Sequence, residues 1–188
     1  GHRARFNESM IFNGVPTTTD DFIQGDLPNS ENEILIKIFN HNEFLAETKL
    51  FFNENMSFGL DPGYDLGNFY QNSAISTRLL ENDNGINFQI QELPEQAMEN
   101  AVIPLVINQS AGQEFRINLH TATIPDPNVY LEDVEEGTFT NLYEGDFVYT
   151  PTSDLDGVGR FFIHMTADTM SNDEVSTSML NAYKEIDA

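Results

Sequence analysis

The sequence lacks cysteine and tryptophan, has few basic residues, and contains no long hydrophobic run. Without cysteine the chain cannot form disulfide bonds, bind zinc through thiolates or use a thiol nucleophile. Because no apolar run approaches the roughly 20 residues that a membrane-spanning helix requires, we expect no membrane insertion. No signal-peptide pattern opens the chain, and Gly1-His2 is typical of a tag remnant, so we expect a fragment of a longer protein.

Acidic residues dominate the charge of the chain. The 188 residues include 31 Asp and Glu but only 8 Lys and Arg, which gives a net charge of −23. Such a surface repels the phosphates of nucleic acids and the headgroups of anionic lipids. We therefore expect no nucleic-acid partner and no peripheral membrane binding. The same charge suits salty or calcium-containing surroundings, where ions screen the self-repulsion.

Apolar and polar residues alternate with a period of two along most of the chain. Residues 86–91, for example, read Ile-Asn-Phe-Gln-Ile-Gln. One buried and one wet face per strand is typical of antiparallel sheets in a sandwich. The predicted strands are residues 34–39, 44–52, 76–80, 86–90, 102–107, 115–119, 129–132, 147–150 and 160–165. The sequence therefore predicts an all-β fold, an antiparallel β-sandwich of about 8–10 strands whose core is filled largely by Phe and Tyr.

The pattern weakens at both ends of the chain. Residues 1–30 are rich in Thr, Asp, Asn and Pro, and predict an irregular N-terminal extension with one candidate strand of the sandwich at residues 4–12. Residues 31–167 carry the β-sandwich domain. Residues 168–188 turn polar and small, as in a linker. Within the domain, Pro104 lacks an N–H and predicts that its strand lies at a sheet edge or contains a bulge.

One loop-like segment is distinctive. Residues 57–66 read Ser-Phe-Gly-Leu-Asp-Pro-Gly-Tyr-Asp-Leu. This segment resembles the pattern T-x-G-F-D-x-x-Y-D-A, which is common in surface proteins that Bacteroidota export through the type IX secretion system. Leu60 replaces the usual aromatic residue and Leu66 the usual Ala.

Four further segments resemble the same proteins in the same order. Residues 86–94 are similar to their L-x-I-Q-x-L-P strand, and residues 101–105 to x-V-I-P-L-G. Residues 128–133 are similar to V-Y-L-x-D, and residues 149–161 to Y-x-F-x-x-x-x-G-x-x-x-D-R-F. Gly159 stands where the family usually has Asp, so the role of that acid does not carry over. The resemblance covers roughly residues 34–165.

The resemblance implies an immunoglobulin-like sandwich just before a C-terminal sorting domain, with residues 168–188 as the linker to that missing domain. It implies a location outside the cell or on the outer-membrane surface, and the type IX translocon as the partner during export. The expected function is a non-catalytic spacer or adhesion module. Two alternatives stay open: a carbohydrate-binding module of a polysaccharide-acting enzyme, which would bind surface polysaccharide, and a part of the export substrate that the translocon recognises.

Two pairs of aspartates are candidates for a calcium site, and no other cofactor is expected. Asp61 and Asp65, with backbone carbonyls near Gly63, form one pair, and Asp154 and Asp156 form the other. Calcium prefers such hard oxygen ligands at short spacing in a loop. Aspartates in loops also cap turns by accepting bonds from nearby backbone N–H groups, and we favour this interpretation.

Exposed aromatic rings are candidates for stacking on sugars, because rings pack on the apolar faces of sugars. The candidates are Tyr64, Phe69, Tyr70 and Tyr143. The alternative, which we favour, is that these rings fill a core that has no Trp. Separately, Asp168-Thr169-Met170 resembles the O-glycosylation acceptor motif of Bacteroidota, with Thr169 as the modified residue.

No catalytic residue is expected. The acidic residues of segment 132–136 could suggest paired carboxylates for glycosidic chemistry, but a solvated hairpin tip explains them better because the run ends at Gly137. His41, His120 and His164 lack metal-ligand spacing, and we expect His164 to be exposed or at an interface. The sequence has no Gly-rich phosphate loop and no Gly-x-Ser-x-Gly elbow, so we do not expect an enzyme.

Overall fold

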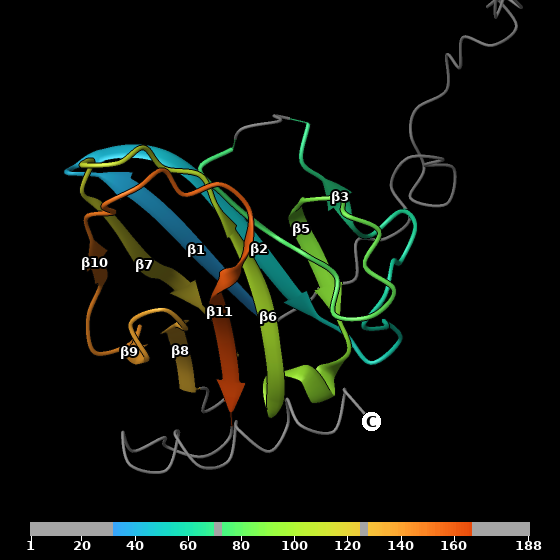
Figure 1. Cartoon of the computed structure of the whole chain (residues 1–188). Coiled ribbons are helices and arrows are strands. Elements are labelled where there is room, and N and C mark those ends of the chain that lie inside the picture. The colour runs from blue at the N-terminus through green and yellow to red at the C-terminus, as the bar shows by residue number, and fades with distance from the viewer. Residues whose placement is uncertain (1–31, 70–72, 125–127, 167–188) are drawn as a thin grey trace, which may run out of the picture.

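The computed structural model of the chain describes residues 32–69, 73–124 and 128–166 (Figure 1). These residues form an 11-stranded sheet and a 3-10 helix, η2 (Glu95–Met98). The strands are β1 (Glu33–Asn40), β2 (Glu43–Phe52), β3 (Leu66–Gly67), β4 (Ile75–Thr77), β5 (Phe88–Leu93), β6 (Asn100–Ile107), β7 (Phe115–Ala122), β8 (Asn128–Asp133), β9 (Thr138–Asn141), β10 (Phe147–Tyr149) and β11 (Val158–Thr166). The predicted all-β fold is confirmed.

The strands follow the order β10-β7-β1-β2-β5-β4-β6-β11-β8-β9, and β3 pairs with β5 outside this path. Every pair is antiparallel except β2–β5, which is parallel, whereas the sequence predicted antiparallel pairing throughout. The parallel pair arises because the chain does not turn back after β2. It passes through residues 53–87, including β3 and β4, before it returns beside β2 as β5. Parallel neighbours always need such a crossover.

The sheet curls until its two halves face each other in a sandwich-like near-barrel (Figure 1). Aromatic rings from distant strands show the closure. The Phe161 ring on β11 lies 6.4 Å from the Phe115 ring on β7 and 5.8 Å from the Phe147 ring on β10. Edge-to-face and tilted ring pairs at such distances add to the stability that area burial provides. As predicted, phenylalanine rings fill much of the core.

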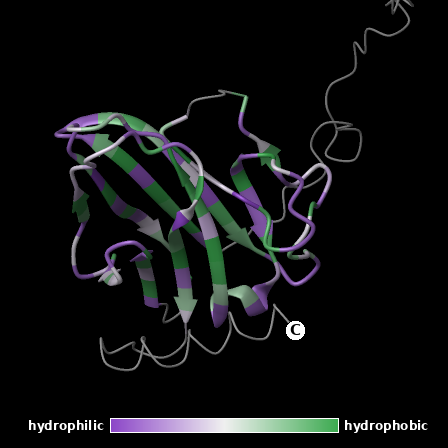
Figure 2. Ribbon diagram, viewed as in Figure 1, coloured by the Kyte–Doolittle hydropathy of each residue, from purple (hydrophilic) through white to green (hydrophobic). Residues whose placement is uncertain are grey.

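The period of two explains which face each strand buries. Ile34, Ile36 and Ile38 of β1 are fully buried, while the residues between them lie on the outer face. Figure 2 shows this alternation of hydrophobic and hydrophilic residues along the long strands. Each fully buried aliphatic side chain stabilises the fold by about 1.5–3 kcal/mol relative to exposure, so alternation fixes the register of the strands.

The nine predicted strands are all present, with shifted ends. The strand predicted at 76–80 ends early, at Thr77, because the backbone N–H groups of Leu80 and Glu81 both donate to the Phe58 carbonyl. The strand predicted at 86–90 is shifted to Phe88–Leu93. The turn predicted at Asn82-Asp83-Asn84-Gly85 has positive φ at Asn82 (53°) and Gly85 (84°). The strands on either side of it pair only at Thr77 and Phe88. Strands β3 and β9 were not predicted.

Pro104 does not lie on an edge strand. Strand β6 has neighbours on both sides, β4 and β11. The β4 ladder, however, ends at the pair Thr77–Leu105, and the Pro104 carbonyl accepts a bond from the Arg78 N–H just beyond it. A residue in an antiparallel ladder directs its N–H and C=O to the same side. An N–H at position 104 would therefore point toward β4, but β4 has already ended at this position. No ladder hydrogen bond is lost there, which is the same reason that proline is tolerated on an edge strand.

The predictions for residues 1–30, including a strand at 4–12, and for the linker at 168–188 lie outside the described residues. Across 32–69, 73–124 and 128–166, the structure contains no helix with the length and hydrophobicity needed to cross a membrane.

Candidate functional site

Asp61 and Asp65 organise the loop between β2 and β3. The Asp61 carboxylate accepts bonds from the backbone N–H and the hydroxyl of Ser57, at 2.8 and 3.1 Å. The Asp65 carboxylate accepts a 2.7 Å bond from the backbone N–H of Asp61. The structure thus brings together the two aspartates that the sequence proposed for calcium. Both act as acceptors for the loop backbone, in the manner of turn-capping aspartates.

Asp65 also ties this loop to the sheet. Its second carboxylate oxygen accepts a 2.9 Å bond from the backbone N–H of Glu92 on β5. The Glu92 side chain is itself buried, and its Oε2 atom has no hydrogen-bond partner. Sequence reasoning missed Glu92, because only the fold shows that the loop covers this position.

Burial and mutual repulsion act on this carboxylate group. Burial raises the pKa of Asp65, and the Asp61 charge adds to the rise, whereas the backbone N–H groups of Asp61 and Glu92 oppose it. Burial likewise raises the pKa of Glu92, helped by the charges of Asp65 and Asp61. Nowhere in the described part of the chain do three His, Cys, Asp or Glu side chains form a set that could hold a metal ion.

Asp154 and Asp156 lie on the loop between β10 and β11, beside the loop that follows β6. The Asp154 carboxylate accepts a 2.8 Å bond from the backbone N–H of Ala111. Between the two aspartates, Leu155 forms an isolated β-bridge with Gln109. Asp154 therefore caps a loop–loop junction, as Asp61 and Asp65 cap their own loop.

Three of the four candidate aromatic residues are exposed, and the fourth, Tyr70, lies outside the described residues. The exposed fractions are 42% for Tyr64, 83% for Phe69 and 48% for Tyr143. The interpretation that these rings fill the core is therefore wrong for these three. Partial burial raises the pKa of Tyr143, which sits in the turn after β9. Thr169, the candidate glycosylation site, lies outside the described residues.

Arg160 forms a bidentate ion pair with Asp133. Its Nε and Nη2 atoms donate to the two carboxylate oxygens of Asp133 at 2.9 and 2.7 Å, and Asp133 is fully buried. The guanidinium carbon lies 4.5 Å from the Tyr149 ring centre. The hydrogen bond to Asp133 raises the pKa of Arg160 above its ordinary value. Bidentate pairs of this kind combine charge with fixed geometry.

The acidic segment at 132–136 is only partly a solvated tip. The side chains of Glu135 and Glu136 are 66% and 57% exposed, as expected for a tip. Asp133 is buried against Arg160. The Glu132 Oε2 atom lies 2.7 Å from His164 Nε2. His164 is 1% exposed, so the prediction of an exposed or interface His is wrong. The cause is β9, whose Phe139 ring covers His164 at 5.3 Å.

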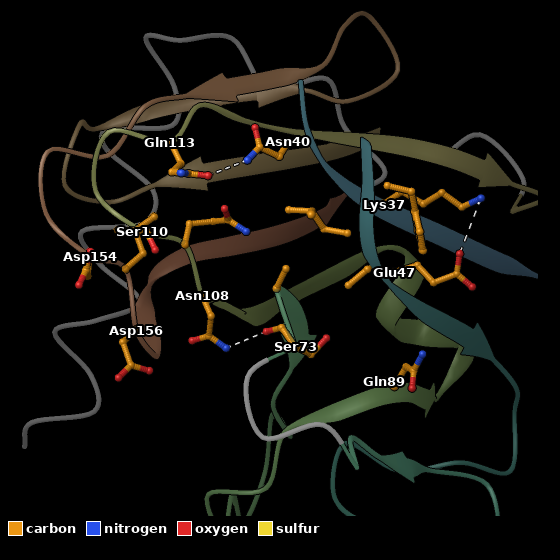
Figure 3. A pocket seen from close by; sticks show the side chains of 16 residues that line it. Lys37, Asn40, Glu47, Ser73, Gln89, Asn108, Ser110, Gln113, Asp154 and Asp156 are labelled. Carbon is orange, nitrogen blue, oxygen red and sulfur yellow. Dashed lines mark hydrogen bonds and ion pairs between the residues drawn. The ribbon is translucent and has the colours of Figure 1, made fainter. Parts of the chain in front are cut away.

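A hollow of about 1230 Å³ opens at the end of the near-barrel that carries the β1–β2 turn. Its walls come from β1 and β2, from the start of β5, from the segment before β4, and from the loops after β6 and β10 (Figure 3). Amide side chains hold the walls together: Asn40 donates to Gln113 at 2.8 Å, and Asn108 donates to the Ser73 carbonyl at 2.7 Å. Sequence reasoning missed this hollow, because its lining comes from separate segments that only the closed sheet brings together.

Comparison of the chain with protein-family models, curated proteins and solved structures finds no match among any of them.

Proposed function

We propose that the chain is a non-catalytic extracellular module, a spacer or adhesion domain, of a cell-surface protein exported by type IX secretion. The supporting observation is that the carboxylates best suited to chemistry accept bonds from the chain itself. Asp61 and Asp65 accept backbone N–H groups, and Asp133 accepts the Arg160 guanidinium. A metal or substrate would have to displace these bonds, whereas a stable folded module depends on them.

Contacts between the resembling segments support the type IX assignment. Asp65, from the first segment, accepts a bond from Glu92 in the second. Asp133, at the end of the fourth segment, binds Arg160 of the fifth, and Arg160 in turn covers Tyr149 of the same segment. Residues that contact one another give a physical reason for these short patterns to occur together. The large negative charge and the absence of cysteine are compatible with export.

A display experiment tests the proposal. The chain is placed between a reporter and a type IX sorting domain in a bacterium with that secretion system, beside a control that carries a Gly/Ser linker of equal length. A folded spacer resists protease, so we expect the reporter to stay attached to intact cells under protease treatment that releases it from the control. Equal release from both fusions, or a reporter that never reaches the surface, would contradict the proposal.

A carbohydrate-binding module is a second candidate, and the exposed aromatic residues favour it. Tyr64 and Phe69 lie on either side of β3, where Leu60, Leu66 and Ile86 are also substantially exposed. An exposed apolar group of this kind often marks an interaction site. Retention of the chain on an insoluble polysaccharide, lost in a Tyr64→Ala and Phe69→Ala double variant but kept in Val148→Ala, would favour this candidate over the spacer.

A further inference from the structure

Strand β2 is paired on both sides over only part of its length. Its partner β1 runs along the strand from Glu43 to Phe51. Its other neighbour, β5, pairs only from Lys49 to Phe52. Within the described ranges, no second strand accompanies residues 43–48, so this stretch is an open edge in the wall of the near-barrel. Unpaired strand edges are templates for pairing with another chain.

The open edge lines the hollow. Four consecutive residues of β2, Phe44 to Glu47, contribute to its lining. Successive side chains of a regular strand point to opposite faces, and the extra residue Leu45 forms a bulge in this stretch. A run of four lining residues therefore places the main chain of β2 beside the hollow. Two of their side chains have other contacts: the Phe44 ring packs against Phe39, and the Glu47 carboxylate lies 3.7 Å from the Lys37 ammonium. Figure 3 shows this ion pair to one side of the hollow.

Hydrogen bonds farther along β2 identify which backbone groups face the hollow. The N–H of Phe52 donates to Asn32, on the β1 side, and the N–H of Asn53 donates to Leu93 of β5. Backbone groups alternate in direction from one residue to the next, and the β1–β2 register is regular from Ala46 to Phe51. The register shifts between Ile38 and Phe39, where Leu45 is the extra residue of β2. From Glu47 to Phe51, the odd-numbered residues therefore direct their N–H and C=O away from β1. Glu47 is the residue whose backbone groups point past the end of β5 into the hollow.

The residues that line the hollow indicate the chemical class and the charge of a ligand that could bind there. The hollow is lined by Asn40, Gln89, Asn108, Gln109 and Gln113, whose amides match the donors and acceptors of a peptide backbone. Its charged lining residues are Glu47, Asp154 and Asp156 against Lys37, so its charge is negative, like that of the whole chain. The one lining aromatic ring, Phe44, packs edge-to-face against Phe39 at 6.0 Å, so the hollow has no second ring to make a platform for a sugar. A neutral or basic peptide fits these walls better than a glycan or an acidic peptide does.

We propose that residues 43–48 of β2 bind a short extended segment of a partner protein, neutral or basic in charge, which adds a strand to the open edge inside the hollow. Six residues of strand span about 20 Å, which suits a short linear segment. In such strand addition, main-chain hydrogen bonds provide the affinity and flanking side chains the selectivity. This binding surface is additional to the proposed spacer role, since a spacer needs no ligand.

The test uses labelled peptides about eight residues long, of alternating threonine and lysine, and fluorescence polarisation in about 150 mM salt. A second peptide of the same sequence carries a methyl group on every backbone amide, so it keeps its charge but has no backbone N–H to donate to a neighbouring strand. We expect saturable binding of the first peptide with a Kd below about 1 mM and at least about tenfold weaker binding of the second. A threonine–glutamate peptide is expected not to bind.

Two variants at Glu47 distinguish the contribution of its backbone N–H to peptide binding from that of its side-chain charge. Glu47→Pro removes the N–H that faces the hollow, without removing a bond to β1, and is expected to weaken binding by about tenfold or more. Glu47→Gln keeps the N–H and removes the ion pair with Lys37, and is expected to bind within about threefold of the parent chain. Thermal unfolding of both variants verifies that each is folded, and the methylated peptide tests the same bonds without altering the protein.

Several outcomes would overturn the proposal. The proposal fails if the methylated peptide binds as tightly as the first, or if folded Glu47→Pro binds the first peptide as tightly as the parent chain does. Either result would mean that the basic peptide is held by the negative charge of the protein and not by backbone hydrogen bonds. No saturable binding of any peptide below about 1 mM would mean that the edge accepts no strand. Self-association of the chain that Glu47→Pro abolishes would identify a second copy as the occupant in place of a partner peptide.

Discussion

Arg160 and Asp133 join two strands that are far apart in the sequence by a bidentate ion pair of 2.9 and 2.7 Å, inside the fold. Asp133 ends β8 and is fully buried, while Arg160 lies on the neighbouring strand β11. The same carboxylate accepts the backbone N–H of Glu135 at 3.1 Å, so it also shapes the turn into β9. One buried carboxylate thus fixes a strand pair and a hairpin at once.

Removal of Asp133 is expected to destabilise the fold strongly. Asp133→Ala leaves the Arg160 charge partly buried without its main partner, and the free energy of unfolding should fall by about 3 kcal/mol or more. Urea unfolding measures the change. Glu135→Ala, which removes an exposed partner of the same Arg160, is the control and should cost at most about 1 kcal/mol. Equal losses for both variants would contradict a special role of the buried pair.

Phe161 is expected to be essential for closing the near-barrel. Its ring contacts Phe115 and Phe147 from the opposite half of the sheet. Phe161→Ala should lower the free energy of unfolding by about 3–5 kcal/mol, because it leaves a cavity at this junction. Phe69, 83% exposed, is the matched control, and Phe69→Ala should change it by no more than about 0.5 kcal/mol. A small effect at Phe161, measured by thermal and urea unfolding, would place the core elsewhere.

Glu92 is expected to contribute to the pH dependence of the free energy of unfolding. Its pKa and that of Asp65 are raised in the folded chain above their ordinary values of 4.5 and 3.8. Between the ordinary and the raised pKa, the folded state binds more protons than the unfolded state, so the free energy of unfolding falls as pH rises through this window. Glu92→Gln removes the Glu92 contribution. The variant should be more stable than the parent at neutral pH, and this advantage should vanish below pH 4.5.

Urea unfolding at a series of pH values tests this prediction, with Glu81→Gln on the surface as the control. The control should follow the parent profile. A Glu92→Gln variant that is less stable than the parent at neutral pH would show that the Glu92 carboxylate stabilises the fold, which would contradict this prediction.

The response to calcium should be that of any divalent salt. Asp61 and Asp65 already accept bonds from the loop backbone, and Asp154 accepts one from Ala111. We therefore expect calcium and magnesium, at equal concentration and ionic strength, to raise the melting temperature equally by screening the net charge of −23. A rise specific to calcium and absent in Asp65→Asn, but present in Asp156→Asn, would instead establish a site between β2 and β3.

The strands with strict alternation could be predicted from the sequence, because their pattern is the direct result of one buried face. Strand β1 and strand β7 are examples. Strand β9 could not, since its four residues include one apolar side chain, Phe139, whose role is to cover His164 on β11. The parallel β2–β5 pair was equally hidden, because period two indicates a strand but not the direction of its neighbour.

The candidate sites were predictable only in part. Aspartates in loops suggested turn caps or metal ligands, and the structure shows Asp61 and Asp65 in one bonded loop. Glu92, whose backbone N–H donates to Asp65, lies on β5, far from this loop in the sequence. The hollow depends on where β5 begins relative to β2, and such a difference in strand length is set by the crossover and not by any local pattern.

A glycan-array screen of the purified chain, with and without calcium, tests directly whether the chain is a structural module that binds neither calcium nor a sugar. We predict no reproducible binding under either condition, because the carboxylates of Asp61 and Asp65 already accept bonds from the loop backbone. Reproducible binding to one class of polysaccharide, lost in the Tyr64→Ala and Phe69→Ala double variant, would contradict the spacer and establish a carbohydrate-binding module.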